Sequence, residues 1–342
     1  MSTKVFERLQ VTADMAVNRL LELVQLSSEE NLLLVGDEST RWAVDELSKK
    51  AQTTYMLLEE QRPLTEVPDD LKEALREKNV LVYIISKAGS EERVFRDKLN
   101  TCAEELGVRV GNLMDVNPQL LDSAFREDPS MIKEFTLQLL DRMQLVREVR
   151  VTSPAGSNFV VEFDKKYSWL ASTGFIEFKK TRNLMPAEIY THPACVEGTI
   201  VIDGAYAGLV GYDDSEELLK ALKKNPITWV VKNNRIVEIR CAHKRIREIT
   251  HREVFEKDSV NGNRIGEFGM GTNLGMKELF GNVMHDEKFP GVHIAHGHGY
   301  ASATGAEYES SVHSDAILLE VSVQDVDSKE YLMRKGKYQK SS

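Results

Sequence analysis

Histidine and carboxylate side chains are concentrated in one stretch of the chain, between Arg264 and Asp315. Five of the eight histidines fall in this stretch, at positions 285, 293, 296, 298 and 313, together with Glu267 and Tyr300. Imidazoles and carboxylates together are the common protein ligands of zinc, manganese, iron and cobalt. The glycines between them allow the backbone to pass close to a bound group. The stretch therefore predicts a divalent-metal site.

The clearest pair of ligands is His313 and Asp315, two residues apart in the segment VHSDAILLEV. Side chains at positions i and i+2 of a strand point to one face, so both groups can reach the same metal ion. The apolar residues that follow predict a buried strand, where a carboxylate must be paired, hydrogen-bonded or metal-bound to stay charged. Asp315 could bridge two ions with its two oxygens. A His–Asp pair on the surface is the alternative.

Three further imidazoles lie close together in the segment VHIAHGHGY. On a regular strand His293 shares a face with Ala295, whereas His296 points to the opposite face. The imidazoles therefore cannot all bind one ion, and their spacing does not choose between them. Those that do not bind metal would orient the ligands or donate to a substrate.

Two glutamates extend the set of candidate ligands. Glu267 lies among glycines and apolar residues in RIGEFGMGTN, where a buried carboxylate would be a ligand or a base, or would pair with Arg264. Glu188 stands between two prolines in MPAEIYTHP. The prolines predict a rigid, irregular loop that could present a functional side chain.

Two different halves of the chain must position these residues. Residues 1–147 alternate short apolar strands such as NLLLVGD and NVLVYII with helices, which predicts a parallel sheet flanked by helices. This half lacks GxGxxG and GxxxxGK[ST], and Gly36 is followed by two acidic residues that would repel a phosphate. Residues 148–342 contain mostly short strands and hairpins, with one helix expected near 245–258. We therefore expect an α/β N-terminal domain with a parallel sheet, then a β-rich (α+β) catalytic domain.

The composition limits the classes of partner. The 342 residues carry a net charge of −10, which argues against binding to nucleic acid or to an anionic membrane. No apolar run approaches the roughly 18 residues of a membrane span, and the N-terminus lacks the apolar core of a signal peptide. Three widely spaced cysteines fit a reducing compartment. We expect a cytoplasmic protein.

Five segments occur in the order found in the aminopeptidase T family of metallo-aminopeptidases, which includes aminopeptidase S and PepS. They are PAEIYTHP, EGTIVIDG, RIGEFGMGTN, HDEKFPGVHIAHGHGY and VHSD, so the chain resembles that family over residues 180–320 and only in architecture over 1–150. The resemblance implies a homodimer that hydrolyses peptides or small amino-acyl substrates with two divalent ions of zinc, cobalt or manganese. It implies catalytic roles for Glu267 and Tyr300. It also implies five metal ligands: Glu188, Glu267, His293, His313 and Asp315.

The chain also resembles the dihydroxypyridine ring-cleaving dioxygenases, which use one ferrous ion held by two histidines and one aspartate. His293, His313 and Asp315 could supply that triad, with His296 and His298 as acid–base groups. His296 replaces a small or apolar residue of the aminopeptidase family, which predicts a specialised pocket. A single-iron enzyme does not need the two glutamates, so their presence favours the dinuclear hydrolase. A non-catalytic, metal-stabilised protein is the third hypothesis.

Overall fold

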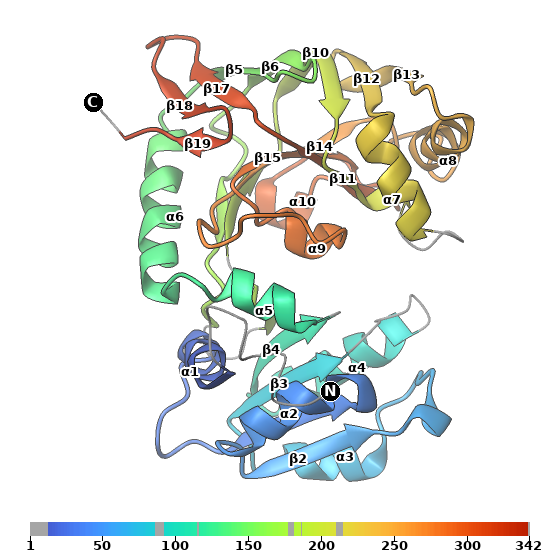
Figure 1. The fold of residues 1–342 in the computed structure, drawn as a ribbon. Helices are drawn as coiled ribbons and strands as arrows, with labels where there is room; N and C mark the ends of the chain where they lie inside the picture. The colour runs from blue at the N-terminus through green and yellow to red at the C-terminus, as the bar shows by residue number, and fades with distance from the viewer. Residues whose placement is uncertain are drawn as a thin grey trace. The chain divides into compact units, whose positions relative to one another are not determined.

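The structure is a computed structural model that describes residues 13–85, 92–114, 116–176, 181–185, 187–209 and 215–340. The chain forms two compact units (Figure 1). The first comprises the residues up to Lys133 together with Thr173–Pro186, and the second comprises Glu134–Ser172 and the residues from Ala187 onward. The expected domain limit between residues 147 and 148 stays a prediction.

The first unit is built on a parallel sheet, as predicted. Among its described residues five strands pair in the order β2-β1-β3-β4-β8, and every pair is parallel. The strands are β1 (Leu32–Asp37), β2 (Thr53–Leu57), β3 (Val80–Ile85), β4 (Arg109–Met114) and β8 (Thr181–Asn183). The helices are α1 (Ala13–Leu23), α2 (Arg41–Ser48), α3 (Asp69–Leu75), α4 (Arg93–Glu105) and α5 (Pro118–Ala124). The apolar runs β1 and β3 are buried along their whole length, as the inner strands of such a sheet must be.

The acidic end of β1 has a structural role. The Asp37 side chain accepts a hydrogen bond from the backbone N–H of Thr40 at 3.0 Å, which caps the turn that follows the strand. The Arg62 guanidinium then donates to Asp37 at 2.8 Å and to Glu92 at 2.5 Å. All three charged side chains are largely buried. Asp37 thus caps the turn and pairs with a buried guanidinium at this end of β1.

The second unit contains two antiparallel sheets. In its described residues one sheet has the order β13-β12-β10-β6-β5-β17-β18-β19 and the other β11-β16-β15-β14-β9-β7. The eight-stranded sheet is formed by β5 (Glu148–Thr152), β6 (Asn158–Glu162), β10 (Cys195–Ile202), β12 (Ile227–Lys232), β13 (Arg235–Arg240), β17 (Ser322–Asp325), β18 (Tyr331–Arg334) and β19 (Lys337–Tyr338). The six-stranded sheet is formed by β7 (Leu170–Ser172), β9 (Glu188–Thr191), β11 (Ala205–Tyr206), β14 (Ile265–Gly271), β15 (Gly291–Gly297) and β16 (His313–Leu318). These sheets confirm the β-rich second half.

One apolar core joins the two sheets. It contains Trp229 of the eight-stranded sheet and Phe268 of the six-stranded sheet, both fully buried. The helices are α6 (Pro129–Met143), α7 (Ser215–Lys224), α8 (Lys244–Phe255), α9 (Val283–Asp286) and α10 (Ala301–Thr304). The sequence predicted α8 but missed α7, whose Leu222 is buried in the same core. Among the described residues no helix is long and apolar enough to span a membrane.

Candidate metal centre

Four neighbouring strands of the six-stranded sheet bring the predicted ligands to one place. Glu267 in β14 lies opposite Ala295 in β15, which in turn lies opposite Asp315 in β16. Residues directly opposite in an antiparallel sheet share a face, and residues two apart on a strand do so as well. His293 is two residues from Ala295, and His313 is two residues from Asp315. The pairing therefore puts two carboxylates and two imidazoles on one face.

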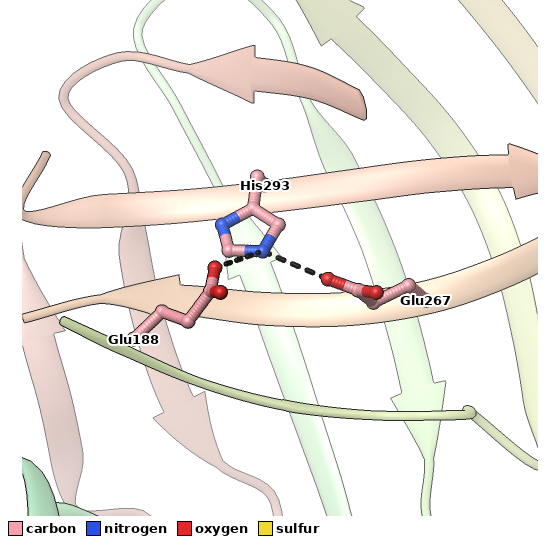
Figure 2. A group of neighbouring side chains, drawn as sticks. All are labelled: Glu188, Glu267 and His293. Atoms are coloured by element: carbon pink, nitrogen blue, oxygen red, sulfur yellow. Dashed lines mark hydrogen bonds and ion pairs between the residues drawn. The ribbon is translucent and has the colours of Figure 1, made fainter. Parts of the chain in front are cut away.

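Glu188 joins the same face from β9, where it lies opposite Gly271. The prediction that Glu188 stands in an irregular loop was wrong, because it is the first residue of a strand. Pairing with β14 imposes the extended conformation there. Glu188 is 7 % exposed and its carboxylate points at His293 (Figure 2).

The first half of the group consists of Glu188, His293 and one oxygen of Glu267. The His293 Nε2 atom is 3.0 Å from Glu267 Oε1 and 3.4 Å from Glu188 Oε2. Dashed lines mark these two contacts in Figure 2. One ligand atom from each of the three residues lies within 4.8 Å of the other two. Three donors this close together could hold one metal ion.

The second half consists of His313, Asp315 and the other oxygen of Glu267. The His313 Nε2 atom is 3.3 Å from Asp315 Oδ2 and 3.9 Å from Glu267 Oε2. The Nδ1 atom of His313 lies 2.9 Å from the carbonyl oxygen of His298, which can only accept a hydrogen bond. His313 therefore carries its proton on Nδ1 when neutral, and Nε2 is left to bind a metal. Glu267, rather than Asp315, presents one oxygen to each histidine.

The carboxylates create a negative potential in this buried place. Burial opposes the charging of His293, but Glu267 and Glu188 outweigh it and raise the pKa of His293 to about 9. Burial likewise opposes the charge on His313, but Asp315 raises the pKa of His313 to about 10. Burial would also keep Asp315 neutral, yet His313 and the other nearby positive groups lower its pKa to about 2. Such a potential favours a divalent cation between these side chains.

Two carboxylate oxygens of the group lack hydrogen bonds. Glu188 Oε2 and Asp315 Oδ1 are buried, and neither has a hydrogen-bond partner among the described residues. Nearly all buried polar atoms in proteins have such a partner, and a missing ion is one reason for an exception. Carboxylate oxygens and imidazole nitrogens are also the donors that zinc, cobalt, manganese and iron accept. The residues present thus fit a divalent metal.

The structure shows why position 269, one of the glycines among the candidate ligands, has no side chain. It lies opposite His293 in the β14–β15 pair. A Cβ atom at Gly269 would come within 1.9 Å of His293 Nε2 and 2.3 Å of its Cε1. The imidazole therefore occupies the space that any other residue would need.

A buried lysine next to Glu188 was not predicted from the sequence. Lys288 Nζ donates to Glu188 Oε1 at 2.5 Å and to Glu287 Oε1 at 2.6 Å, and Lys288 is only 3 % exposed. Burial would favour the neutral amine, but the two carboxylates raise the pKa of Lys288, so the group is an ammonium. Lysines are rarely buried, so a lysine in a segment without hydrophobic periodicity is normally interpreted as exposed. No signal in the sequence indicates this contact.

His296 belongs to the core rather than to the site. It lies on the opposite face of β15, as predicted, and is completely buried. Its Nδ1–H donates to the carbonyl oxygen of Gly262 at 2.6 Å, and its Nε2 accepts from the Tyr206 hydroxyl at 2.7 Å. Burial lowers the pKa of His296 to about 4, so it is neutral. The predicted acid–base role of His296 was therefore wrong, and the specialised pocket stays a prediction.

The ring of Tyr300 lies beside the second half of the group. Its centroid is 4.7 Å from that of His313, and the residue is 37 % exposed. Its backbone has φ 53° and ψ 51°, the left-handed region that a bulky residue rarely adopts. Such strain, about 1–3 kcal/mol, occurs mainly at functional sites. Burial, and then the charges of Glu267 and Asp315, raise the pKa of Tyr300, so its hydroxyl stays protonated and can donate a hydrogen bond. His298 Nε2 lies 2.6 Å from Glu309 Oε2, and its role as an acid–base group stays a prediction.

Comparison with known proteins identifies the fold. No model of a protein family matches the chain, and no curated protein matches it. Its structure is similar to that of a 2,5-dihydroxypyridine dioxygenase from Pseudomonas putida KT2440, with a TM-score of 0.64, 15 % identity, and coverage of 97 % of this chain and 98 % of that one. It is also similar to wild-type AmpT from Thermus thermophilus, with a TM-score of 0.65, 15 % identity, and coverage of 95 % and 98 %. At this identity the likeness concerns the fold, which here is one that enzymes share.

Proposed function

We propose that the protein is a metal-dependent aminopeptidase that removes N-terminal residues from peptides at a dinuclear divalent-metal site. The position of Glu267 carries this proposal. Its two oxygens face two different histidines, so one carboxylate joins two groups of donors. A single ion would not need five protein ligands together with an open position for substrate, whereas two ions that share a carboxylate would.

In this proposal each half of the group would hold one ion. Glu188 and His293 would hold one, His313 and Asp315 the other, and Glu267 would bridge them. When bound, zinc, cobalt or manganese ions would polarise the scissile carbonyl and lower the pKa of an attacking water. The fold shared with AmpT agrees with this assignment.

Two residues of the chain would act on the reacting atoms. The Tyr300 hydroxyl remains protonated and would donate to the oxyanion that develops on the carbonyl. Glu267 would take a proton from the water and return it to the leaving amine. Each oxygen of Glu267 faces one histidine, and both oxygens would therefore be metal ligands in this proposal. Glu267 could accept a proton only while one of its oxygens is not bound to a metal.

The alternative is a mononuclear Fe(II) ring-cleaving dioxygenase. One observation favours it: His293, His313 and Asp315 provide two imidazoles and one carboxylate on one face of the sheet, as the facial triad requires. The fold shared with the dihydroxypyridine dioxygenase agrees with this assignment as well. Glu188 and Glu267 would then have no role in holding the iron.

Counting metal ions in wild type and Glu267→Gln decides between these functions. The protein would be loaded with zinc, cobalt or manganese, or with Fe(II) without oxygen, and assayed on amino-acyl p-nitroanilides and on dihydroxypyridines. The aminopeptidase predicts two ions per chain, and Glu267→Gln should bind fewer ions and lose peptide hydrolysis by at least about 100-fold. One iron, oxygen uptake and an unaffected Glu267→Gln variant would instead establish the dioxygenase.

The setting of this activity is part of the proposal. We propose a cytoplasmic homodimer that acts on peptides or small amino-acyl compounds and has neither nucleic acid nor membrane as a partner. The net charge of −10 supports the exclusion of polyanionic partners. Analytical ultracentrifugation would test the dimer, and a monomer at micromolar concentration would contradict it.

A further inference from the structure

The two halves of the metal group differ in their charged neighbours. We call Glu188 with His293 the Glu188 half, and His313 with Asp315 the Asp315 half; Glu267 belongs to both. In the Glu188 half the Lys288 ammonium contacts Glu188 Oε1 at 2.5 Å. In the Asp315 half the ion pair that the structure records for Asp315 is with His313, itself a proposed metal ligand. A permanent positive charge therefore touches only one of the two halves among the described residues.

Lys288 is firmly held where it is. Its Nζ also contacts Glu287 Oε1 at 2.6 Å, and only 4 % of its side chain is exposed. Its backbone N–H donates to the carbonyl oxygen of His285 at 3.0 Å, and its own carbonyl oxygen accepts from the backbone N–H of Asn273 at 3.0 Å. The ammonium is therefore buried beside Glu188, and hydrogen bonds hold the backbone of Lys288 on both sides.

We propose that Lys288 is a positioning residue that makes the two metal positions unequal, so that the Asp315 half binds its ion first and more tightly. This inference rests on the proposed two-ion site. Lys288 occupies Oε1 of Glu188, so this carboxylate offers a metal the single oxygen Oε2, which has no hydrogen-bond partner among the described residues. The ammonium also repels a second cation bound to the same carboxylate. Glu287 accepts a second hydrogen bond from the ammonium, which keeps the ammonium beside Glu188.

A metal titration of Lys288→Met tests this proposal without any assay of activity. Metal-free full-length protein would be titrated with zinc against a chromophoric chelator, and with Co²⁺ while its absorption bands are recorded. Wild type should bind two ions whose affinities differ by at least about tenfold. In Lys288→Met the weaker affinity should rise at least about tenfold, because the ammonium no longer occupies Oε1 of Glu188 or repels the ion. A fall in this affinity, which is the usual result of losing a group that orients a metal ligand, would overturn the proposal. His293→Ala should remove the weaker event and leave the tighter one.

Lys257→Met is the matched control. Lys257 Nζ lies 2.6 Å from Glu253 Oε2, a second pair of lysine with a buried glutamate in the same unit. Neither residue belongs to the metal group, so this variant should leave both affinities unchanged. A change equal to that of Lys288→Met would overturn the proposal, because it would be a general effect of removing a positive charge.

The remaining outcomes separate this inference from the proposed function. If wild type binds no ion, the proposed metal centre itself fails. Two equal affinities in wild type, one ion in both wild type and Lys288→Met, or an unchanged ratio in Lys288→Met would overturn the role of Lys288 while the metal centre stands. If Lys288→Met does not fold, Lys288→Gln replaces it, because a glutamine amide can donate a hydrogen bond without carrying a charge. The weaker affinity should then rise, and an unchanged or lower affinity overturns the proposal.

Discussion

Gly269→Ala is the substitution that most directly tests how the sheet builds the site. Non-bonded heavy atoms pack at about 3.5 Å, whereas a Cβ at Gly269 would lie 1.9 Å from His293 Nε2, so the contact falls short by about 1.6 Å. Gly269 is in β14, which pairs with β9 on one side and β15 on the other. The backbone is therefore held on both sides, and the imidazole has to move.

The displaced imidazole should produce two measurable effects. Overpacking of a tightly filled place costs about 1–3 kcal/mol of the free energy of unfolding. His293 also leaves the position where its Nε2 lies between Glu188 and Glu267, so the metal affinity of the Glu188 half should fall about 10–100-fold. His313 and Asp315 keep their places, and the tighter event should persist.

Urea denaturation of the metal-free protein and a zinc titration would measure both effects. Gly291→Ala is the control, since it adds the same methyl group to a glycine of a neighbouring strand, where the nearest atom would be the Leu318 carbonyl oxygen at 3.3 Å. That distance is only slightly shorter than a normal van der Waals contact. The free energy of unfolding should therefore fall by about 1 kcal/mol or less. A Gly269→Ala protein with wild-type stability and affinity would show that the His293 ring does not lie over Gly269, which would refute the reasoning.

Two further predictions concern buried charges elsewhere in the chain. Arg62→Met leaves the carboxylates of Asp37 and Glu92 buried without their guanidinium. The free energy of unfolding, measured by urea denaturation, should fall by about 3–5 kcal/mol while metal binding is unchanged. A fall below about 1 kcal/mol would contradict this prediction. Burial raises the pKa of Asp286 to about 6, so the folded protein binds the proton of this carboxyl more tightly than the unfolded chain does. The free energy of unfolding should therefore fall by up to about 3 kcal/mol as the pH rises from 4 to 7. Asp286→Asn should flatten the dependence of the urea midpoint on pH over that range, whereas an identical slope in both proteins would contradict the assignment.

The sequence by itself determined the features that depend on local patterns. The apolar runs of β1 and β3 predicted a buried parallel sheet, because only strands covered on both faces lack polar alternation. The two-residue period of a strand predicted that His293 and His296 point to opposite faces. The helix α7, with its amphipathic pattern, could have been predicted by the same argument and was overlooked.

The tertiary structure decided how the candidate ligands combine. The pairing of β9 with β14 turned the expected loop at Glu188 into a strand, and the pairing of three strands put Glu267 between two histidines. Burial made His296 a neutral side chain, and hydrogen bonds with distant residues hold it in the core. The ion pair with Glu188 allows Lys288 to be buried. The local pattern of the sequence predicts on which face of a strand a residue lies. Contacts between strands that are distant in the sequence depend on register, which only the folded sheet fixes.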